Sequence, residues 1–140
     1  MRRTACALMV TAALLFLTGC GNTAQPVRNL AVSGSVLLLE TEHFSQSGKT
    51  CSGRGTLASI REGAAVTIDK QPAATLSRGT MTAERNCRFL FTASVPQTEG
   101  LQRHAFSVAE LPPVTGVIND RVRADWQAAN ADGWVTIGWD

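Results

Sequence analysis

The alternation of apolar and polar residues over short runs constrains the fold of this chain more than any other feature. In residues 87–95 the apolar side chains recur at every second position, and Arg88 opens the opposite face. A period of two is that of a β-strand with one buried face. Similar runs follow between Gly, Pro, Ser and Asn residues, without a long segment of period 3.6. This pattern predicts an all-β fold, a small single-domain β-sandwich or a small barrel.

The expected strands cover most of the chain beyond residue 30. They are residues 32–40, 64–69, 75–81, 87–95, 104–109, 114–118 and 134–139. In the first of them, Gly34 predicts a bulge or a close approach of two backbones. Between the first two strands, residues 41–55 are expected to form a long polar loop that contains Cys51.

Turn-forming residues separate the expected strands. Residues 70–72 are expected to form the turn after the second strand, and Pro96 is expected to end the fourth. Residues 111–113 predict a rigid break, and residues 131–133 a turn. Residues 120–130 are open between strand and helix, because their apolar residues alternate while part of the segment favours a helix.

The first twenty residues have the pattern of a secretory signal. Arg2 and Arg3 precede an apolar run over residues 5–17, and small residues follow it. Leu17-Thr18-Gly19-Cys20 resembles the lipobox of bacterial lipoproteins. The resemblance implies that the signal is removed before Cys20 and that this cysteine receives acyl chains such as palmitate. The alternatives are a membrane-spanning anchor, which needs about 20 apolar residues, and a signal peptide without lipidation.

Three parts of the chain follow from this interpretation. Residues 1–19 are the signal peptide, residues 20–29 the lipidated cysteine with a polar tether, and residues 30–140 a β-sandwich domain. Pro26 argues against a helix in the tether. We therefore expect the protein on the extracytoplasmic face of the cell membrane, where the lipid on Cys20 holds it.

The mature chain is expected to be electrically neutral. Lys plus Arg falls from 13 to 11 when Arg2 and Arg3 leave with the signal, which equals the 11 Asp plus Glu. A neutral domain without a basic run lacks the positive surface with which nucleic-acid-binding proteins neutralise phosphates. We therefore expect no nucleic-acid partner.

Two cysteines remain for the folded domain, Cys51 and Cys87. In an exported chain, oxidising surroundings favour a disulfide between them. Such a bridge closes a loop of about 36 residues, which the chain-entropy argument values at roughly 3.5–4 kcal/mol. A metal site is the alternative, but neither cysteine belongs to a C-x-x-C pair and no histidine lies at ligand spacing.

A further pattern covers the middle of the chain, residues 51–96. It consists of Cys51-Ser52-Gly53, Gly63, Val66-Thr67-Ile68-Asp69, Leu76-Ser77-Arg78-Gly79, and Cys87-Arg88-Phe89-Leu90-Phe91 continuing to Val95-Pro96. This pattern resembles a group of uncharacterised exported proteins and lipoproteins of actinobacteria with a transthyretin-like β-sandwich. The resemblance implies that Cys51 and Cys87 pair and that the strands alternate as described. It implies no activity.

Two histidines are the candidates for catalysis. His43 lies in the expected polar loop near Ser45, Ser47 and Ser52, and His104 begins a strand. Brought together by folding, the histidines could join a carboxylate at a metal site, or His43 could activate a serine. Isolated histidines and serine-rich loops are more often solvated surface. We therefore expect no catalytic residue, no metal, no cofactor and a protein that is not an enzyme.

Three tryptophans, Trp126, Trp134 and Trp139, lie within residues 126–140. In the last expected strand, Trp134 and Trp139 fall on opposite faces, and only one of these faces can be core. Trp126 and Trp139 are therefore candidates for an exposed surface that binds a partner. The alternative is simple packing at the margin of the sheet.

The sequence thus indicates a lipid-anchored lipoprotein of the cell envelope that acts as a binding or accessory module, with an envelope protein as a possible partner. One alternative is a carrier of an apolar ligand, which needs a cavity of about 300 Å³ or more between the sheets. A second alternative is a metal-dependent or hydrolytic enzyme that uses His43 and His104.

Overall fold

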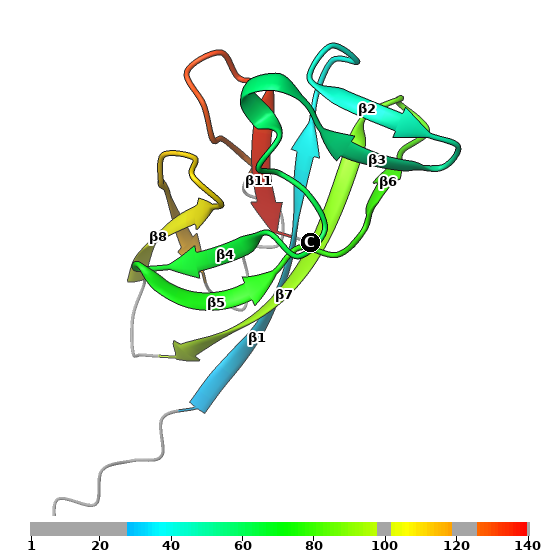
Figure 1. Ribbon diagram of the computed structural model, residues 1–140. Helices are drawn as coiled ribbons and strands as arrows, with labels where there is room; N and C mark the ends of the chain where they lie inside the picture. The colour runs from blue at the N-terminus through cyan, green and yellow to red at the C-terminus, as the bar shows by residue number, and fades with distance from the viewer. Residues whose placement is uncertain (1–27, 98–101, 119–125, 140) are drawn as a thin grey trace, which may run out of the picture.

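The computed structural model shows an all-β protein in which two antiparallel sheets pack against each other (Figure 1). The structure describes residues 28–97, 102–118 and 126–139. The expected signal peptide, the motif at residues 17–20 and most of the tether lie outside these residues. In the described ranges there is no α-helix, and so no helix that is long and apolar enough to span a membrane. The predicted all-β, sandwich-like fold is confirmed.

Seven strands of the described chain form the larger sheet, and four form the smaller one. In spatial order the larger sheet contains β10 (Gln127–Ala128), β11 (Val135–Trp139), β1 (Arg28–Leu38), β7 (Cys87–Gln97), β6 (Gly79–Met81), β3 (Thr50–Gly53) and β2 (Phe44–Ser47). The smaller sheet contains β5 (Gln71–Thr75), β4 (Ala65–Ile68), β8 (Gln102–Val108) and β9 (Val114–Ile118). A single 3₁₀ turn, η1 (Gly55–Leu57), follows β3 in the described chain.

The core lies between the two sheets. Along β7 the predicted alternation is confirmed, because every second side chain is buried and those between are exposed. Across the core, the ring of Phe106 in β8 lies 4.2 Å from the ring of Trp139 in β11, measured between centroids. The buried members of β7 are Cys87, Phe89, Phe91, Ala93 and Val95. We call the opposite side of the larger sheet, which points away from this core, the outer face.

Gly34 lies where β1 is sandwiched between two neighbouring strands. It stands opposite Phe91 of β7 and opposite Trp139 of β11. A Cβ atom at this position would come within 2.5 Å of the Phe91 ring and 2.8 Å of the Gly138 carbonyl oxygen. The predicted close approach is therefore confirmed, since only glycine lets the Phe91 ring pack directly on the backbone of β1.

The predicted long polar loop over residues 41–55 is wrong, because most of it forms a β-hairpin. Strands β2 and β3 pair along their full length, and Gly48 and Lys49 form the two-residue turn between them. Gly48 has a φ of 60°, a conformation that suits a hairpin turn and favours glycine. Phe44 anchors the hairpin in the core, with 3% of its surface exposed. The remaining side chains of β2 are polar and exposed, so no hydrophobic alternation marks this strand.

The predicted strand over residues 75–81 is also wrong, because the chain changes sheets within it. β5 ends at Thr75 in the smaller sheet, and β6 begins at Gly79 in the larger one. Leu76 is buried at the crossing, and its N–H donates to the carbonyl of Ala64. Alternation along a sequence shows which side chains are buried, but it does not show which sheet a strand joins.

The turn between β4 and β5 lies one residue earlier than predicted. It consists of Asp69 and Lys70, whose φ values are 51° and 66°, and Gln71 and Pro72 already belong to β5. A two-residue turn with both φ values positive matches the right-handed twist of the flanking strands. Asp tolerates this left-handed conformation better than most residues.

Two strands extend further than predicted and pair with each other at their extended ends. β1 begins at Arg28, so two residues assigned to the tether belong to the sheet, and β7 continues through Pro96 to Gln97. β6 pairs with β7 only at Cys87 and Arg88. At Pro96, β7 therefore has a described hydrogen-bonded strand on one side only, where a residue without an N–H is tolerated.

The C-terminal elements agree more closely with the sequence patterns. β8, β9 and β11 match the predicted strands to within two residues, and Gly133, with a φ of 74°, closes the predicted turn at residues 131–133. From the open segment 120–130, the structure describes the short strand β10. Residues 119–125 lie outside the described chain.

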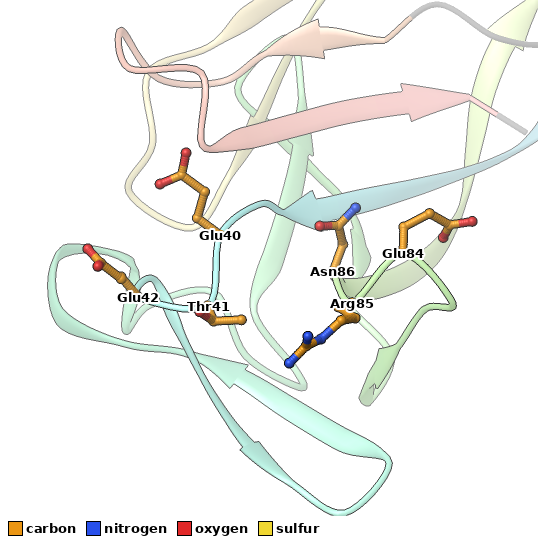
Figure 2. Close-up of a pocket in the computed structure, with 6 residues that line it drawn as sticks. All are labelled: Glu40, Thr41, Glu42, Glu84, Arg85 and Asn86. Carbon is orange, nitrogen blue, oxygen red and sulfur yellow. The ribbon is translucent and has the colours of Figure 1, made fainter.

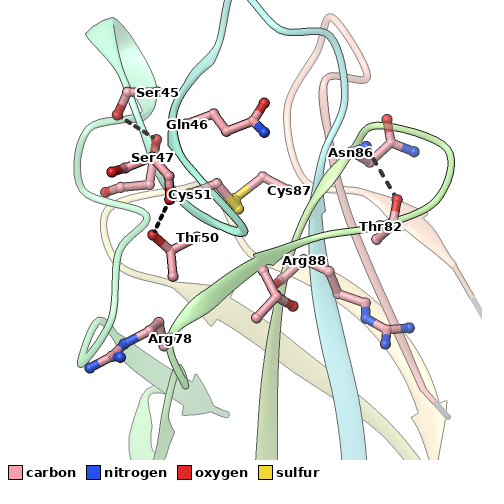
Figure 3. Close-up of a disulfide and its surroundings, with 12 residues drawn as sticks. Ser45, Gln46, Ser47, Thr50, Cys51, Arg78, Thr82, Asn86, Cys87 and Arg88 are labelled. Carbon is pink, nitrogen blue, oxygen red and sulfur yellow. Dashed lines mark hydrogen bonds between the residues drawn. A yellow bond between two sulfur atoms is a disulfide. The ribbon is translucent and has the colours of Figure 1, made fainter.

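The predicted disulfide between Cys51 and Cys87 is confirmed (Figure 3). The two Cα atoms lie 5.8 Å apart, and both cysteines are buried. The bridge connects β3 with the first residue of β7 across β6. Because β3 pairs with β6 at only two positions, Thr50 and Cys51, the disulfide provides the covalent link that holds the β2–β3 hairpin on the sheet.

Candidate functional site

The two histidines have different partners. His104 lies on the core side of β8, is 8% exposed, and has its Nδ1 atom 2.7 Å from Oδ2 of Asp69. His43 precedes β2, and its ring stacks on Trp134 with the centroids 3.8 Å apart. The Nε2 atom of His43 lies 3.7 Å from a carboxylate oxygen of Glu40. None of these contacts joins the two histidines, and in the described ranges no group of three or more His, Cys, Asp or Glu is placed to hold a metal ion.

The Asp69 carboxylate joins the β4–β5 turn to β8. It accepts the backbone N–H of Ala105 at 2.9 Å, while the Asp69 N–H donates to the Ala105 carbonyl at 2.8 Å. The hydrogen bond from Ala105, and next the one to His104, lower the pKa of Asp69 below its usual value. The side chain of Asp69 stays 54% exposed. This arrangement accounts for the burial of His104 as part of a structural contact between two strands.

The serines near His43 are part of the hairpin. The hydroxyl of Ser45 donates to the carbonyl of Ser52 at 3.4 Å, which ties β2 to β3. The carbonyl of Ser47 accepts the hydroxyl of Thr50 at 2.8 Å. These contacts lie within the hairpin, and none of them joins a serine hydroxyl to His43.

A surface cleft of about 440 Å³ lies between the segment that follows β1 and the turn that precedes β7 (Figure 2). Figure 2 shows that its carboxylates point in different directions, whereas the Arg85 guanidinium extends into the gap. The cleft is lined by Glu40, Thr41, Glu42, Glu84, Arg85 and Asn86. Its lining is polar and lies at the surface, unlike the apolar cavity between the sheets that a ligand carrier needs.

Local hydrogen bonds shape both walls of this cleft. Glu40 and Arg85 adopt positive φ values of 65° and 66°. The pKa of Glu84 is lowered, mainly by its own backbone N–H and then by the hydroxyl of Thr82, with a smaller effect from Arg88. These contacts fold the two turns, but they do not bring the carboxylates to one point.

The tryptophans are distributed differently from the prediction. Trp139 is 4% exposed and lies in the core with Val135 and Ile137, so its assignment to a partner surface is wrong. The core face of β11 is therefore the one with Trp139, and Trp134 is half-buried beneath the ring of His43. Trp126 is 41% exposed, as expected of a side chain available to a partner.

The indole of Trp126 lies over Gly138 of β11. A Cβ atom built on Gly138 would fall 2.0–2.4 Å from three atoms at the fused edge of the indole, Cδ2, Cε3 and Cε2. The ring therefore rests directly on the backbone of β11 where glycine leaves room for it. Position 138 faces away from the core, because the residues before and after it in β11 are buried in the core. Trp126 therefore covers the outer face of the larger sheet.

A second exposed apolar side chain lies on the same face. Leu90 of β7 is 44% exposed, and it stands opposite Ser35 of β1, which in turn stands opposite Gly138 of β11. Residues in direct register point to the same side of a sheet. Leu90, Ser35 and Gly138 thus form one row across three strands, with Trp126 at its end. We call these four residues the apolar row.

Leu90 is not among the surface residues predicted from the sequence. The available signal was the alternation of β7, which places Leu90 on the same face as Arg88 and opposite the buried phenylalanines. That Trp126 reaches the same row was not visible in the sequence, because the strand order β10–β11–β1–β7 brings together segments far apart in the chain.

No protein-family model, curated protein or solved structure was found to match this chain. The resemblance of residues 17–20 to a lipobox, and that of residues 51–96 to the actinobacterial sandwich proteins, therefore stay predictions from the sequence.

Proposed function

We propose that this protein is a lipid-anchored lipoprotein of the cell envelope, a binding or accessory module without enzymatic activity. It is held on the extracytoplasmic face of the cell membrane by acyl chains on Cys20. There it docks an envelope protein on the outer face of its larger sheet, at the apolar row. The domain presents a rigid surface to its partner and contributes no chemistry to it.

The observation that carries this proposal is the position of the two exposed apolar side chains. Trp126 and Leu90 are the large apolar residues of the described chain that are exposed, and they flank one row of one face. Burial of apolar surface contributes roughly 25 cal/mol per Å². Tryptophan is also enriched among the residues that dominate binding energy at protein interfaces. Single exposed apolar residues are common on protein surfaces, but two in one row favour a docking surface.

Support for the anchor comes from the sequence. An Arg-led apolar run ends in Leu17-Thr18-Gly19-Cys20, and β1 begins eight residues after Cys20. Each buried methylene of an acyl chain contributes about 0.8 kcal/mol, so two or three chains hold a protein stably on a bilayer. A domain held in this way meets other envelope proteins at high local concentration.

Photocrosslinking in native membranes tests the docking surface. A photoreactive amino acid at Thr92, an exposed outer-face position of β7, should crosslink the full-length protein to a specific partner. Trp126→Ala and Leu90→Ser should each abolish this product, because they remove the apolar anchors. The same photoreactive residue at Thr115, exposed on β9 of the smaller sheet, is the control and should give no such product. A product that forms equally in both variants would contradict the proposed surface.

A further inference from the structure

We infer that the docked segment of the partner carries a carboxylate beside its apolar anchor, and that Arg88 binds this carboxylate. The inference rests on the proposed function, because it concerns the same face of the same sheet. It adds the chemical class of the partner: a protein segment that is both apolar and acidic.

The apolar row is already closed to water at its centre. Ser35 stands between Leu90 and Gly138 on the outer face, yet it is fully buried, and its hydroxyl has no hydrogen-bond partner among the described residues. Trp126 covers the adjacent Gly138. The centre of the row is therefore dry, and its two ends present apolar surface.

Arg88 is the charged side chain of this face. Apart from Arg88, the outward-facing residues described on β1, β7 and β11 are uncharged. They are Asn, Ala, Ser, Leu, Thr, Pro and Gly. Arg88 is exposed, two positions from Leu90 on β7, and opposite the half-buried Leu37 of β1. Its guanidinium takes part in none of the described salt bridges, and its charge makes only a minor contribution to the lowered pKa of Glu84 in the preceding turn. In Figure 3 the side chain extends away from the disulfide.

The charge and the spacing define the partner segment. Residues two apart on a strand are separated by about 6.6 Å along the backbone, so Arg88 is close enough to Leu90 to bind a carboxylate beside the apolar anchor that covers Leu90. A basic partner segment would meet Arg88 with like charge, which disfavours binding. Guanidinium forms two parallel hydrogen bonds with a carboxylate, which adds geometric specificity to the charge.

Synthetic peptides provide the probe. Three immobilised ten-residue peptides differ only at two central positions and carry Phe-x-Glu, Phe-x-Lys or Ser-x-Glu. Full-length protein in detergent micelles should bind the Phe-x-Glu peptide, and the other two peptides less. Arg88→Gln should weaken binding of Phe-x-Glu by about two- to fivefold, the effect of one exposed ion pair, and remove its dependence on salt. Arg88→Lys should keep part of the affinity for the Phe-x-Glu peptide and part of its dependence on salt.

The variants distinguish failure of this inference from failure of the proposed function. One result would support the docking surface and show that the acidic partner is wrong. In that result Trp126→Ala and Leu90→Ser lose peptide binding, the Phe-x-Glu and Phe-x-Lys peptides bind the unmodified protein equally, and Arg88→Gln does not change binding. If Trp126→Ala and Leu90→Ser keep full binding, both proposals are wrong. Three further results would also overturn the inference. They are binding to immobilised glycans but to none of the peptides, self-association of the protein in sedimentation, and no binding to any peptide. Circular dichroism confirms that each variant is folded.

Discussion

At the scale of single residues, the exposed carboxylate of Asp69 and the buried hydroxyl of Ser35 differ in their hydrogen bonding. The carboxylate of Asp69 gains hydrogen bonds from Ala105 and His104, whereas the hydroxyl of Ser35 gains none from the residues that the structure describes. A net hydrogen bond stabilises a protein by about 1 kcal/mol, but a buried polar group without a partner costs about 1–3 kcal/mol. The two residues should therefore respond to substitution with opposite signs.

Replacing Ser35 by alanine should leave stability unchanged or raise it, by up to about 1 kcal/mol. The substitution removes a buried hydroxyl that makes no hydrogen bond within the described part of the chain, while the Cβ atom that fills the row is kept. Chemical denaturation followed by tryptophan fluorescence measures the change. Ser33→Ala is the matched control, because Ser33 lies two positions away on the same face and is exposed. A clear loss of stability in Ser35→Ala alone would show that the hydroxyl has a partner after all.

Replacing Asp69 by asparagine should lower stability at neutral pH by about 1 kcal/mol, a value reduced by the exposure of the side chain. Asparagine tolerates the left-handed turn, so the change mainly removes the charge. The pKa of Asp69 is lower in the folded chain than in the unfolded one. Its contribution is therefore complete above the unfolded value, about 4, and lost as pH falls through the folded value.

Unfolding midpoints between pH 2 and 7 test this sign. The difference between Asp69→Asn and the unmodified protein should shrink as the pH falls below about 4. Glu62→Gln, an exposed carboxylate in a surface ion pair with Arg78, serves as the control with little effect. A difference that grows on acidification would contradict the cause given for the lowered pKa of Asp69.

At the scale of elements, the β2–β3 hairpin depends on two weak attachments and one strong one. Its strand β3 pairs with β6 at two positions, Phe44 is its buried apolar anchor, and Cys51 carries the bridge to Cys87. The remaining surface of the hairpin is largely polar. By contrast, β1 and β7 pair over eleven residues and bury a continuous set of side chains. The two regions should therefore differ in local stability.

Loss of the disulfide should release the hairpin before it affects the rest of the larger sheet. Cys51→Ser should lower the free energy of unfolding by about 4 kcal/mol, from the entropy of the opened loop. Hydrogen exchange followed by mass spectrometry should show that β2 and β3 of the variant are less protected than β1, because the released hairpin opens locally while β1 exchanges only through global unfolding. Equal protection of β1 and the hairpin in the variant would contradict the view that the bridge holds the hairpin on the sheet.

At the scale of the whole molecule, the sheets form one domain, and the proposed lipid anchor would decide where it acts. Residues 21–27 separate the proposed lipidated cysteine from β1, so eight residue steps lead from Cys20 to Arg28. Even fully extended, eight residues reach at most about 28 Å. A lipidated protein of this design would keep its partner surface close to the bilayer, which suits a partner that is itself part of the envelope.

Changing Cys20 to serine should separate anchoring from folding. The variant should lose incorporation of labelled palmitate and should leave the membrane fraction or remain as an uncleaved precursor. The processed or purified domain should unfold at the same midpoint as the lipidated protein, because Cys20 lies eight residues before β1. Fractionation with palmitate labelling, beside thermal unfolding, measures both effects. Unchanged labelling of Cys20→Ser would rule out Cys20 as the lipidated residue.

The sequence by itself determined the features that depend on neighbouring residues. The period of two along β7 assigns its buried and exposed faces, and Gly34 marks a close approach of backbones. The Cys51–Cys87 bridge follows from the two cysteines that lie outside the predicted signal and its lipobox. Each of these rests on local geometry or on elimination among few residues, so one chain suffices to derive them. The prediction of an all-β fold rests on the same local signals summed along the chain.

Only the tertiary structure decided which strands neighbour each other. The hairpin at β2–β3 carries little hydrophobic alternation, the split of β5 from β6 depends on the sheet that each one joins, and Trp139 is buried because Phe106 and Phe91 close over it. The apolar row depends on the same order, since it unites residues from β1, β7, β11 and the segment before β10. Strand order is set by long-range packing, and that information is not contained in the period of any single strand.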